Sequence, residues 1–148
     1  PGVSHAIRPQ GRLPLPHAGW RGLLDGIVES AARILGPGFA ADVGPSIGPC
    51  CYEVGTELVD AFAAAGHERY LIDRWFLAPA PPRGSRERPR LRLDVAGANR
   101  DQLLLAGVPE EQIFPSGLCT AMHLDVLTSY RAEKEAASRI AGVIRARQ

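Results

Sequence analysis

Apolar residues recur at helical spacing in two stretches of the chain. After Trp20 they return every three or four positions until Gly36-Pro37-Gly38 stops the pattern, and a similar pattern ends at Gly66. This spacing, closed by glycine, is typical of a helix with one buried face. A third helix is indicated by a run rich in Ala, Asn, Gln and Leu that ends at Gly107. The predicted helices cover residues 21–35, 53–65 and 96–106.

Shorter apolar stretches predict strands. Residues 91–95 alternate apolar and charged side chains, and an apolar stretch at 39–47 is broken by Gly44 and Pro45. The segment 78–90 contains four prolines and a Gly-Ser pair, which predicts a loop. The predicted strands cover residues 39–47, 91–95, 111–115 and 140–144, with a tight loop at 48–52.

Strands and helices alternate along the chain, which predicts one α/β or α+β domain. The first sixteen residues include four prolines, and proline lacks the N–H group that a sheet requires. We therefore predict an irregular segment at 1–16 and a folded part at 17–148.

Composition narrows the functional classes. With 148 residues and 45% hydrophobic side chains, the chain can bury the core of one domain. The formal net charge of +1 argues against nucleic-acid and membrane-surface partners, because proteins that bind these partners carry an excess of basic side chains. Three cysteines cannot form a paired disulfide framework, and no apolar run approaches the roughly 18 residues of a membrane span. These features favour a reducing, cytoplasmic setting.

The segment HAGWRG combines His17, Trp20 and Arg21 at the start of the first predicted helix. Free N–H groups at a helix start and an arginine are suited to phosphate, and a neutral imidazole can bind a metal. The alternative is a packed tryptophan corner in which the glycines allow a tight backbone.

The segment GPSIGPCCYEVG contains adjacent cysteines, Cys50 and Cys51. They lack the two-residue spacer of a zinc knuckle, so their spacing favours buried structural thiols over a metal site. Cys119, with His123 four residues later, fits a nucleophile and base or a buried thiol beside a solvent histidine. Arg131 can pair with phosphate or with nearby glutamates.

Four segments together resemble the YfiH-type laccase-domain family, whose members are described as polyphenol oxidases or as purine nucleoside phosphorylases. They are HAGWRG, GPSIGPCCYEVG, LDVAGANRDQLLLAGV and the pair CT and SYR. The resemblance implies a layered α/β mixed-sheet sandwich with flanking helices. It also implies phosphorolysis of adenosine, inosine and guanosine, with adenosine deamination as a further reaction.

The resemblance implies a metal site and a substrate site. Family members hold one zinc, or copper in older descriptions, through two histidines and a cysteine, and His17 matches one of these ligands. The other two lie upstream in the family and have no counterpart here, so we expect the C-terminal portion of a truncated copy with an incomplete site. Arg21 is the expected catalytic residue. The expected contacts to purine nucleoside and phosphate are Ser129, Tyr130 and Arg131.

Two alternatives to phosphorolysis stay open at this stage. One is an inactive fragment with a structural role, and the other is a hydrolase that uses a cysteine thiolate and His17. A multicopper oxidase is disfavoured, because four histidines cannot supply both a blue copper site and a histidine-rich cluster.

Overall fold

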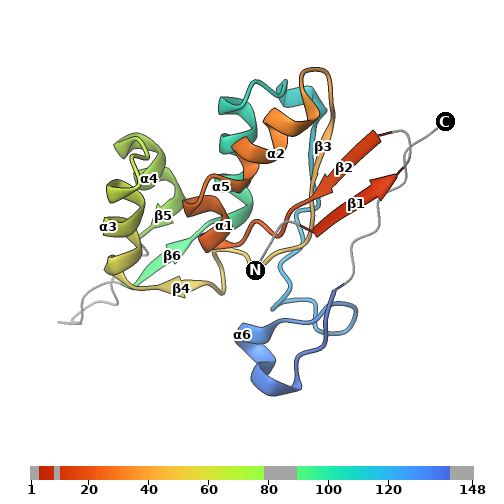
Figure 1. The fold of residues 1–148 in the computed structure, drawn as a ribbon. Helices are drawn as coiled ribbons and strands as arrows, with labels where there is room; N and C mark the ends of the chain where they lie inside the picture. Colours follow the sequence, from red (N-terminus) through yellow and green to blue (C-terminus); the bar gives the residue numbers. More distant parts are fainter. Residues whose placement is uncertain (1–3, 9–10, 79–89, 141–148) are drawn as a thin grey trace.

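The computed structural model describes residues 4–8, 11–78 and 90–140, and for residues 4–8 and 11–15 it describes the backbone only. Figure 1 shows the arrangement of its helices and strands. The α-helices are α1 (Trp20–Leu24), α2 (Ile27–Leu35), α3 (Thr56–Ala64), α4 (Arg69–Trp75), α5 (Val95–Leu105) and α6 (Tyr130–Glu133). Two 3₁₀ turns are η1 (Glu110–Gln112) and η2 (Lys134–Ala136).

Short strands form three small sheets in the described residues. The strands are β1 (Ser4–Arg8), β2 (Gly11–Leu15), β3 (Ala41–Val43), β4 (Glu53–Val54), β5 (Phe76–Leu77), β6 (Leu91–Leu93) and β7 (Ile113–Pro115). β1 and β2 pair antiparallel, β3 and β7 pair parallel, and β4-β6-β5 form an antiparallel sheet. This mixture of helices with parallel and antiparallel strands confirms the predicted α/β class.

The helices lie in separate groups (Figure 1). In this view α1, α2 and α5 lie together at the centre, α3 and α4 lie beside the β4-β6-β5 sheet, and α6 lies below them. α5 contacts α1, α2 and α4, and it also contacts both strands of the parallel pair. The central position of α5 lets it support segments that are far apart in the sequence. No helix in the described ranges is long and apolar enough to cross a bilayer.

The predicted helix over 21–35 is two helices. Gly26 has a φ of 69°, in the left-handed region that side-chain-bearing residues avoid, and the chain changes direction there between α1 and α2. The second helix ends at Leu35, as expected from Gly36. The break matters for the site, because it separates the HAGWRG segment from the longer helix.

The prediction of an irregular N-terminal segment is wrong for the described backbone. β1 and β2 form a hairpin in which Pro14 is paired in register with His5. In a two-stranded sheet each strand has one edge without a partner, and a residue lacking an N–H is tolerated there.

The other predicted elements are mostly shorter than expected. The predicted helix 53–65 begins instead with β4, and α3 starts only after Gly55. The predicted strand 91–95 stops at Leu93, because the Asp94 carboxylate accepts a hydrogen bond from the Gly97 N–H at 2.9 Å and caps α5. Residues 79–89 of the predicted loop 78–90, and the part of the last predicted strand beyond residue 140, lie outside the described residues.

Aromatic side chains from α3, α4 and β5 form the centre of one part of the core. Phe62 is fully buried, and its ring lies 6.0 Å from that of Trp75 and 5.4 Å from that of Phe76, both edge to face. Edge-to-face pairs of this kind add to the free energy of burial. The indole Nε1 of Trp75 donates a hydrogen bond of 2.9 Å to the buried carboxylate of Asp101 in α5. This bond ties α4 to the helix that supports the HAGWRG segment.

We expect Asp101→Ala to destabilise the protein by about 1–3 kcal/mol, because it leaves the buried Trp75 indole N–H without an acceptor. Asp101→Asn keeps an acceptor oxygen and is expected to cost less. Urea unfolding of the two variants measures the difference. Equal losses for both variants would show that the hydrogen bond to Trp75 is not the main contribution of Asp101.

Candidate functional site

The HAGWRG loop is held by α5. His17 is exposed at the entry to α1, and the Asn99 side-chain amide donates hydrogen bonds of 3.0 Å to the Ala18 carbonyl and 2.8 Å to the Val95 carbonyl. A β-carbon on Gly22 would lie 2.8 Å from the His17 carbonyl oxygen, so only glycine allows this close approach. Two of the four family-like segments therefore meet here. Sequence reasoning did not single out Asn99, although an amide on the apolar side of a helix is a signal for such a backbone contact.

Arg21 lies on the outer side of α1. Its guanidinium carbon is 4.8 Å from the centre of the Trp20 ring, the geometry of a cation–π contact. On the inner side, the Gln102 amide of α5 donates a hydrogen bond of 3.1 Å to the Leu23 carbonyl. This hydrogen bond holds the inner side of α1 against α5, while the Arg21 side chain is exposed.

The Ser-Tyr-Arg segment begins α6 and contacts the GPSIGPCCYEVG segment. The guanidinium carbon of Arg131 is 4.9 Å from the centre of the buried Tyr52 ring. Ser129 is buried and donates its N–H to the Glu133 carboxylate at 2.7 Å, whereas Tyr130 is 72% exposed. The Thr128 hydroxyl, also 2.7 Å from that carboxylate, and then the Ser129 N–H lower the pKa of Glu133.

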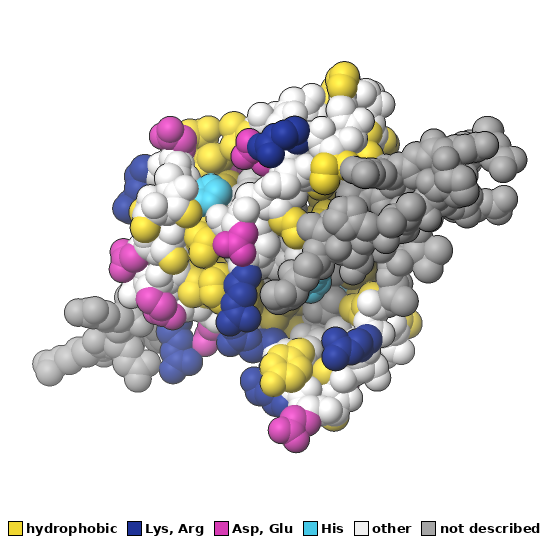
Figure 2. All heavy atoms as spheres, viewed as in Figure 1, with side chains coloured by type: hydrophobic (Ala, Val, Ile, Leu, Met, Phe, Trp, Pro, Cys, Tyr) yellow, Lys and Arg dark blue, Asp and Glu magenta, His cyan; other side chains and the backbone are white. Residues whose placement is uncertain are grey.

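Basic side chains gather on one face of the molecule. Figure 2 shows dark blue side chains over the region between α1, the β4-β6-β5 sheet and α6. Arg92 of β6 donates a hydrogen bond of 2.7 Å to the Cys50 carbonyl. Within the described part of the chain, neither Arg21 nor Arg131 forms an ion pair with a carboxylate. The positive charges of Arg21 and Arg131 are therefore not neutralised by a carboxylate of the described residues.

The three cysteines form one cluster. The Sγ atoms of Cys50, Cys51 and Cys119 all lie within 4.8 Å of one another. Cys119 is buried, but Cys50 is exposed, so the prediction of buried structural thiols is wrong for Cys50. The spacing of adjacent cysteines could not reveal the third sulfur, which comes from a segment that follows β7.

Hydrogen bonding shifts the pKa values of two of these thiols in opposite directions. Burial alone would raise the pKa of Cys119, but the Gly48 N–H, the Cys50 thiol and the N–H groups of Ala121 and Met122 lower it to about 7. The hydrogen bond with the Cys50 thiol is the largest cause, and burial the second, that raises the pKa of Cys51 to about 11. Of these two thiols, Cys119 therefore ionises at the lower pH.

We expect the rate of Cys119 alkylation in the reduced, metal-free protein to rise with pH and reach half its plateau near pH 7, because only the thiolate reacts. Cys51 is the internal control, since a pKa of about 11 keeps it protonated over the same range. Iodoacetamide labelling followed by peptide mass spectrometry measures both. A midpoint for Cys119 near its ordinary value of 9.0 would contradict this assignment.

His123 does not form a nucleophile–base pair with the Cys119 thiol. Its Nδ1 lies 2.9 Å from the Cys119 carbonyl oxygen, so this ring nitrogen contacts the backbone of Cys119. A base must reach the proton that it removes. This geometry gives the Cys119 thiol no base from His123.

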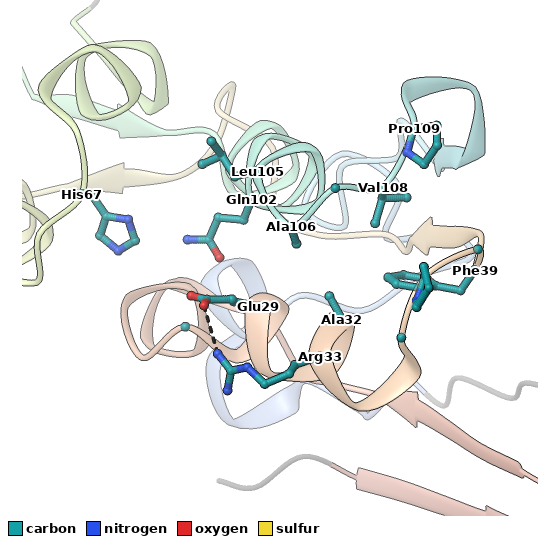
Figure 3. A pocket seen from close by; sticks show the side chains of 15 residues that line it. Glu29, Ala32, Arg33, Phe39, His67, Gln102, Leu105, Ala106, Val108 and Pro109 are labelled. Carbon is teal, nitrogen blue, oxygen red and sulfur yellow. Dashed lines mark hydrogen bonds and ion pairs between the residues drawn. The ribbon is translucent and has the colours of Figure 1, made fainter.

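A cavity of about 580 Å³ lies elsewhere, between α2, the loop that follows it and the end of α5 (Figure 3). Its charged pair, Glu29 and Arg33, is joined by a hydrogen bond of 2.9 Å within α2. Burial lowers the pKa of His67, another lining residue, and so favours its neutral form. None of the predicted site residues lines this cavity. Its size alone does not make it the functional site.

Comparison with known proteins identifies the family. The model of the family described as "Multi-copper polyphenol oxidoreductase laccase" matches residues 7–147. The chain belongs to this laccase family. The purine nucleoside phosphorylase YlmD of Geobacillus stearothermophilus is 33% identical over 147 residues, which cover 93% of the chain and 50% of that relative. The purine nucleoside phosphorylase YfiH of Escherichia coli is 33% identical over 121 residues, covering 80% of the chain and 44% of that protein.

Solved laccase-family structures share the fold. The crystal structure of YfiH from Bacillus licheniformis superposes with a TM-score of 0.65 at 30% identity, over 79% of this chain and 43% of that one. The crystal structure of YlmD from Geobacillus stearothermophilus superposes with a TM-score of 0.62 at 33% identity, over 80% of this chain and 43% of that one. These matches confirm the YfiH-type fold, and the chain spans about half the length of these relatives.

The described residues do not complete the zinc site that the laccase-family resemblance implies. The resemblance implies three protein ligands for that site, of which His17 is the one expected in this sequence. In the described ranges, the group of three metal-ligand side chains is the cysteine cluster, and His17 is not part of it. We therefore assign no step of the chemistry to a metal at His17.

Proposed function

We propose that this chain forms part of a purine nucleoside phosphorylase, and that it supplies the residues that bind phosphate. The observation that carries the proposal is the pair of arginines, Arg21 and Arg131. Each lies over an aromatic ring, and neither is neutralised by a carboxylate in the described residues. Relatives at about 33% identity carry the name of this activity.

Phosphorolysis needs a bound phosphate oxygen next to the anomeric carbon of the ribose. That oxygen forms a bond to the carbon while the bond to the purine nitrogen breaks, so the products are ribose 1-phosphate and the purine base. In our proposal the Arg21 and Arg131 guanidinium groups bind and orient the phosphate dianion, for which their paired donors are suited. Ser129 and Tyr130 contact the nucleoside.

Adenosine deamination stays a prediction. Deamination would release ammonia and leave the glycosidic bond intact, so its products differ from those of phosphorolysis. Hydrolysis breaks the glycosidic bond as phosphorolysis does, but it yields free ribose without consuming phosphate.

The test is an assay of adenosine, inosine and guanosine with the complete protein that carries this chain, with and without inorganic phosphate. We expect release of the base only when phosphate is present. Release that is equally fast without phosphate would replace the proposal with a hydrolase. Absence of phosphate-dependent release from all three nucleosides would refute it.

A further inference from the structure

The cysteine cluster is not used by the proposed phosphorolysis. It joins two segments that are distant in sequence, the Gly48–Tyr52 turn and the segment at Cys119. The three sulfurs lie within 4.8 Å of one another, and the group contains no carboxylate or imidazole. Such a purely thiol donor set differs in chemistry from the mixed histidine and cysteine set implied at His17.

Backbone hydrogen bonds fix the position of Cys119 against the other segment. Ser46 and Cys119 form a parallel bridge, in which the Ser46 N–H donates to the Leu118 carbonyl at 3.3 Å and the Thr120 N–H donates to the Ser46 carbonyl at 3.0 Å. The bridge lies just beyond the paired strands β3 and β7. The sulfur of Cys119 is therefore held beside the turn by the fold.

The turn that carries the other two cysteines is also fixed. The Cys51 and Tyr52 N–H groups both donate to the Gly48 carbonyl at 3.0 Å, and Arg92 bonds the Cys50 carbonyl from the neighbouring strand. A β-carbon on Gly48 would lie 3.3 Å from the Cys50 sulfur and 3.4 Å from the Cys119 sulfur. Glycine at this position keeps a side chain away from the sulfurs.

The spacing of the sulfurs suits a metal ion. Zinc–sulfur bonds of about 2.3 Å in a tetrahedral site place neighbouring sulfurs about 3.8 Å apart. Sulfurs within 4.8 Å of one another need only small side-chain rotations to reach this spacing. Thiolates select Zn²⁺ and Cu⁺ over hard cations such as Mg²⁺ and Ca²⁺. The exposure of Cys50 opens the site to an entering ion.

We propose that Cys50, Cys51 and Cys119 bind one thiophilic d¹⁰ cation, Zn²⁺ or Cu⁺. The ion replaces the thiol protons, which pass to solvent, and its binding joins the turn to the segment that follows β7. The Gly48 N–H, which donates to the Cys119 sulfur at 3.2 Å, stabilises that thiolate. With three protein ligands, a bound Zn²⁺ keeps a fourth position for solvent.

The test is a metal titration of the reduced, metal-free chain, with a chromogenic chelator as competitor and Zn²⁺ and Cu⁺ as separate probes. We expect one ion per chain for at least one of the two metals. Cys50→Ser is the main variant, because Cys50 is exposed and its replacement leaves the core intact. We expect this variant to bind more than about 100-fold more weakly, beyond the usual cost of losing a supporting contact. Circular dichroism verifies its fold.

His17→Ala separates this site from the one that the family implies. We expect this variant to bind the metal as tightly as the unmodified chain. Binding lost in His17→Ala and kept in Cys50→Ser would overturn the proposal. So would the lack of stoichiometric binding of both metals, or a reduced chain that binds no metal and converts two of its thiols to a disulfide in air. None of these outcomes alters the phosphorolysis test.

Discussion

Arg21→Ala is expected to lower kcat/KM for nucleoside phosphorolysis by about 10²–10³-fold. This is the usual cost of removing one hydrogen-bond donor with which a protein stabilises an anion. The reason is that the proposed site binds a dianion with two guanidinium groups, and the variant leaves one of them. Because the Arg21 side chain is exposed over Trp20, its loss removes only a contact worth about 0.5–1 kcal/mol of stability. A large kinetic effect with a small stability effect would therefore identify a functional role.

Arg33→Ala is the matched control for Arg21. Arg33 is an exposed arginine whose partner is Glu29, one turn away in α2. Such a pair contributes only about 0.3–0.5 kcal/mol to the stability of the helix. Because Arg33 is not part of the proposed phosphate site, we expect its replacement to leave kcat/KM unchanged. If Arg21→Ala and Arg33→Ala gave the same kcat/KM as the unmodified enzyme, Arg21 would have no part in the mechanism.

Trp75→Ala is expected to cost about 3–5 kcal/mol, the usual range for deleting a large buried aromatic side chain. Trp75 is 1% exposed, packs against Phe62 and holds the Asp101 carboxylate. For a domain of this size the loss corresponds to a fall in melting temperature of roughly 6–20 °C, at about 2–4 °C per kcal/mol. Differential scanning calorimetry measures it directly.

Tyr70→Ala in the same helix provides the comparison for Trp75. Tyr70 is 60% exposed, so its replacement should change stability by no more than about 0.5 kcal/mol. Similar melting temperatures for the Trp75→Ala and Tyr70→Ala variants would mean that the aromatic cluster around Phe62 does not anchor α4 as described.

The sequence predicted best those elements whose ends carry local signals. The predicted helix 96–106 differs by one residue at each end from α5, because an aspartate cap begins it and Gly107, with a φ of 88°, follows it. α4 was missed, although its buried residues Leu71, Ile72 and Trp75 face one side. With seven residues, that pattern is too short to separate a helix from a buried strand.

The contacts that build the site depend on pairings that no local pattern reveals. Asn99 reaches the Ala18 carbonyl across 81 residues of sequence, and Cys119 joins a turn 71 residues before it. A signal for the second contact was present in the two predicted strands 39–47 and 111–115. If they pair in parallel, the residues that follow them meet at one edge of the sheet, as Gly48 and Cys119 do.

The most direct test of the proposed function is ³¹P NMR of the complete protein acting on inosine and inorganic phosphate. We expect ribose 1-phosphate in amounts equal to the hypoxanthine released, and almost none with the double variant Arg21→Ala/Arg131→Ala. Hypoxanthine accompanied by free ribose, or an undiminished yield of ribose 1-phosphate from the double variant, would contradict it.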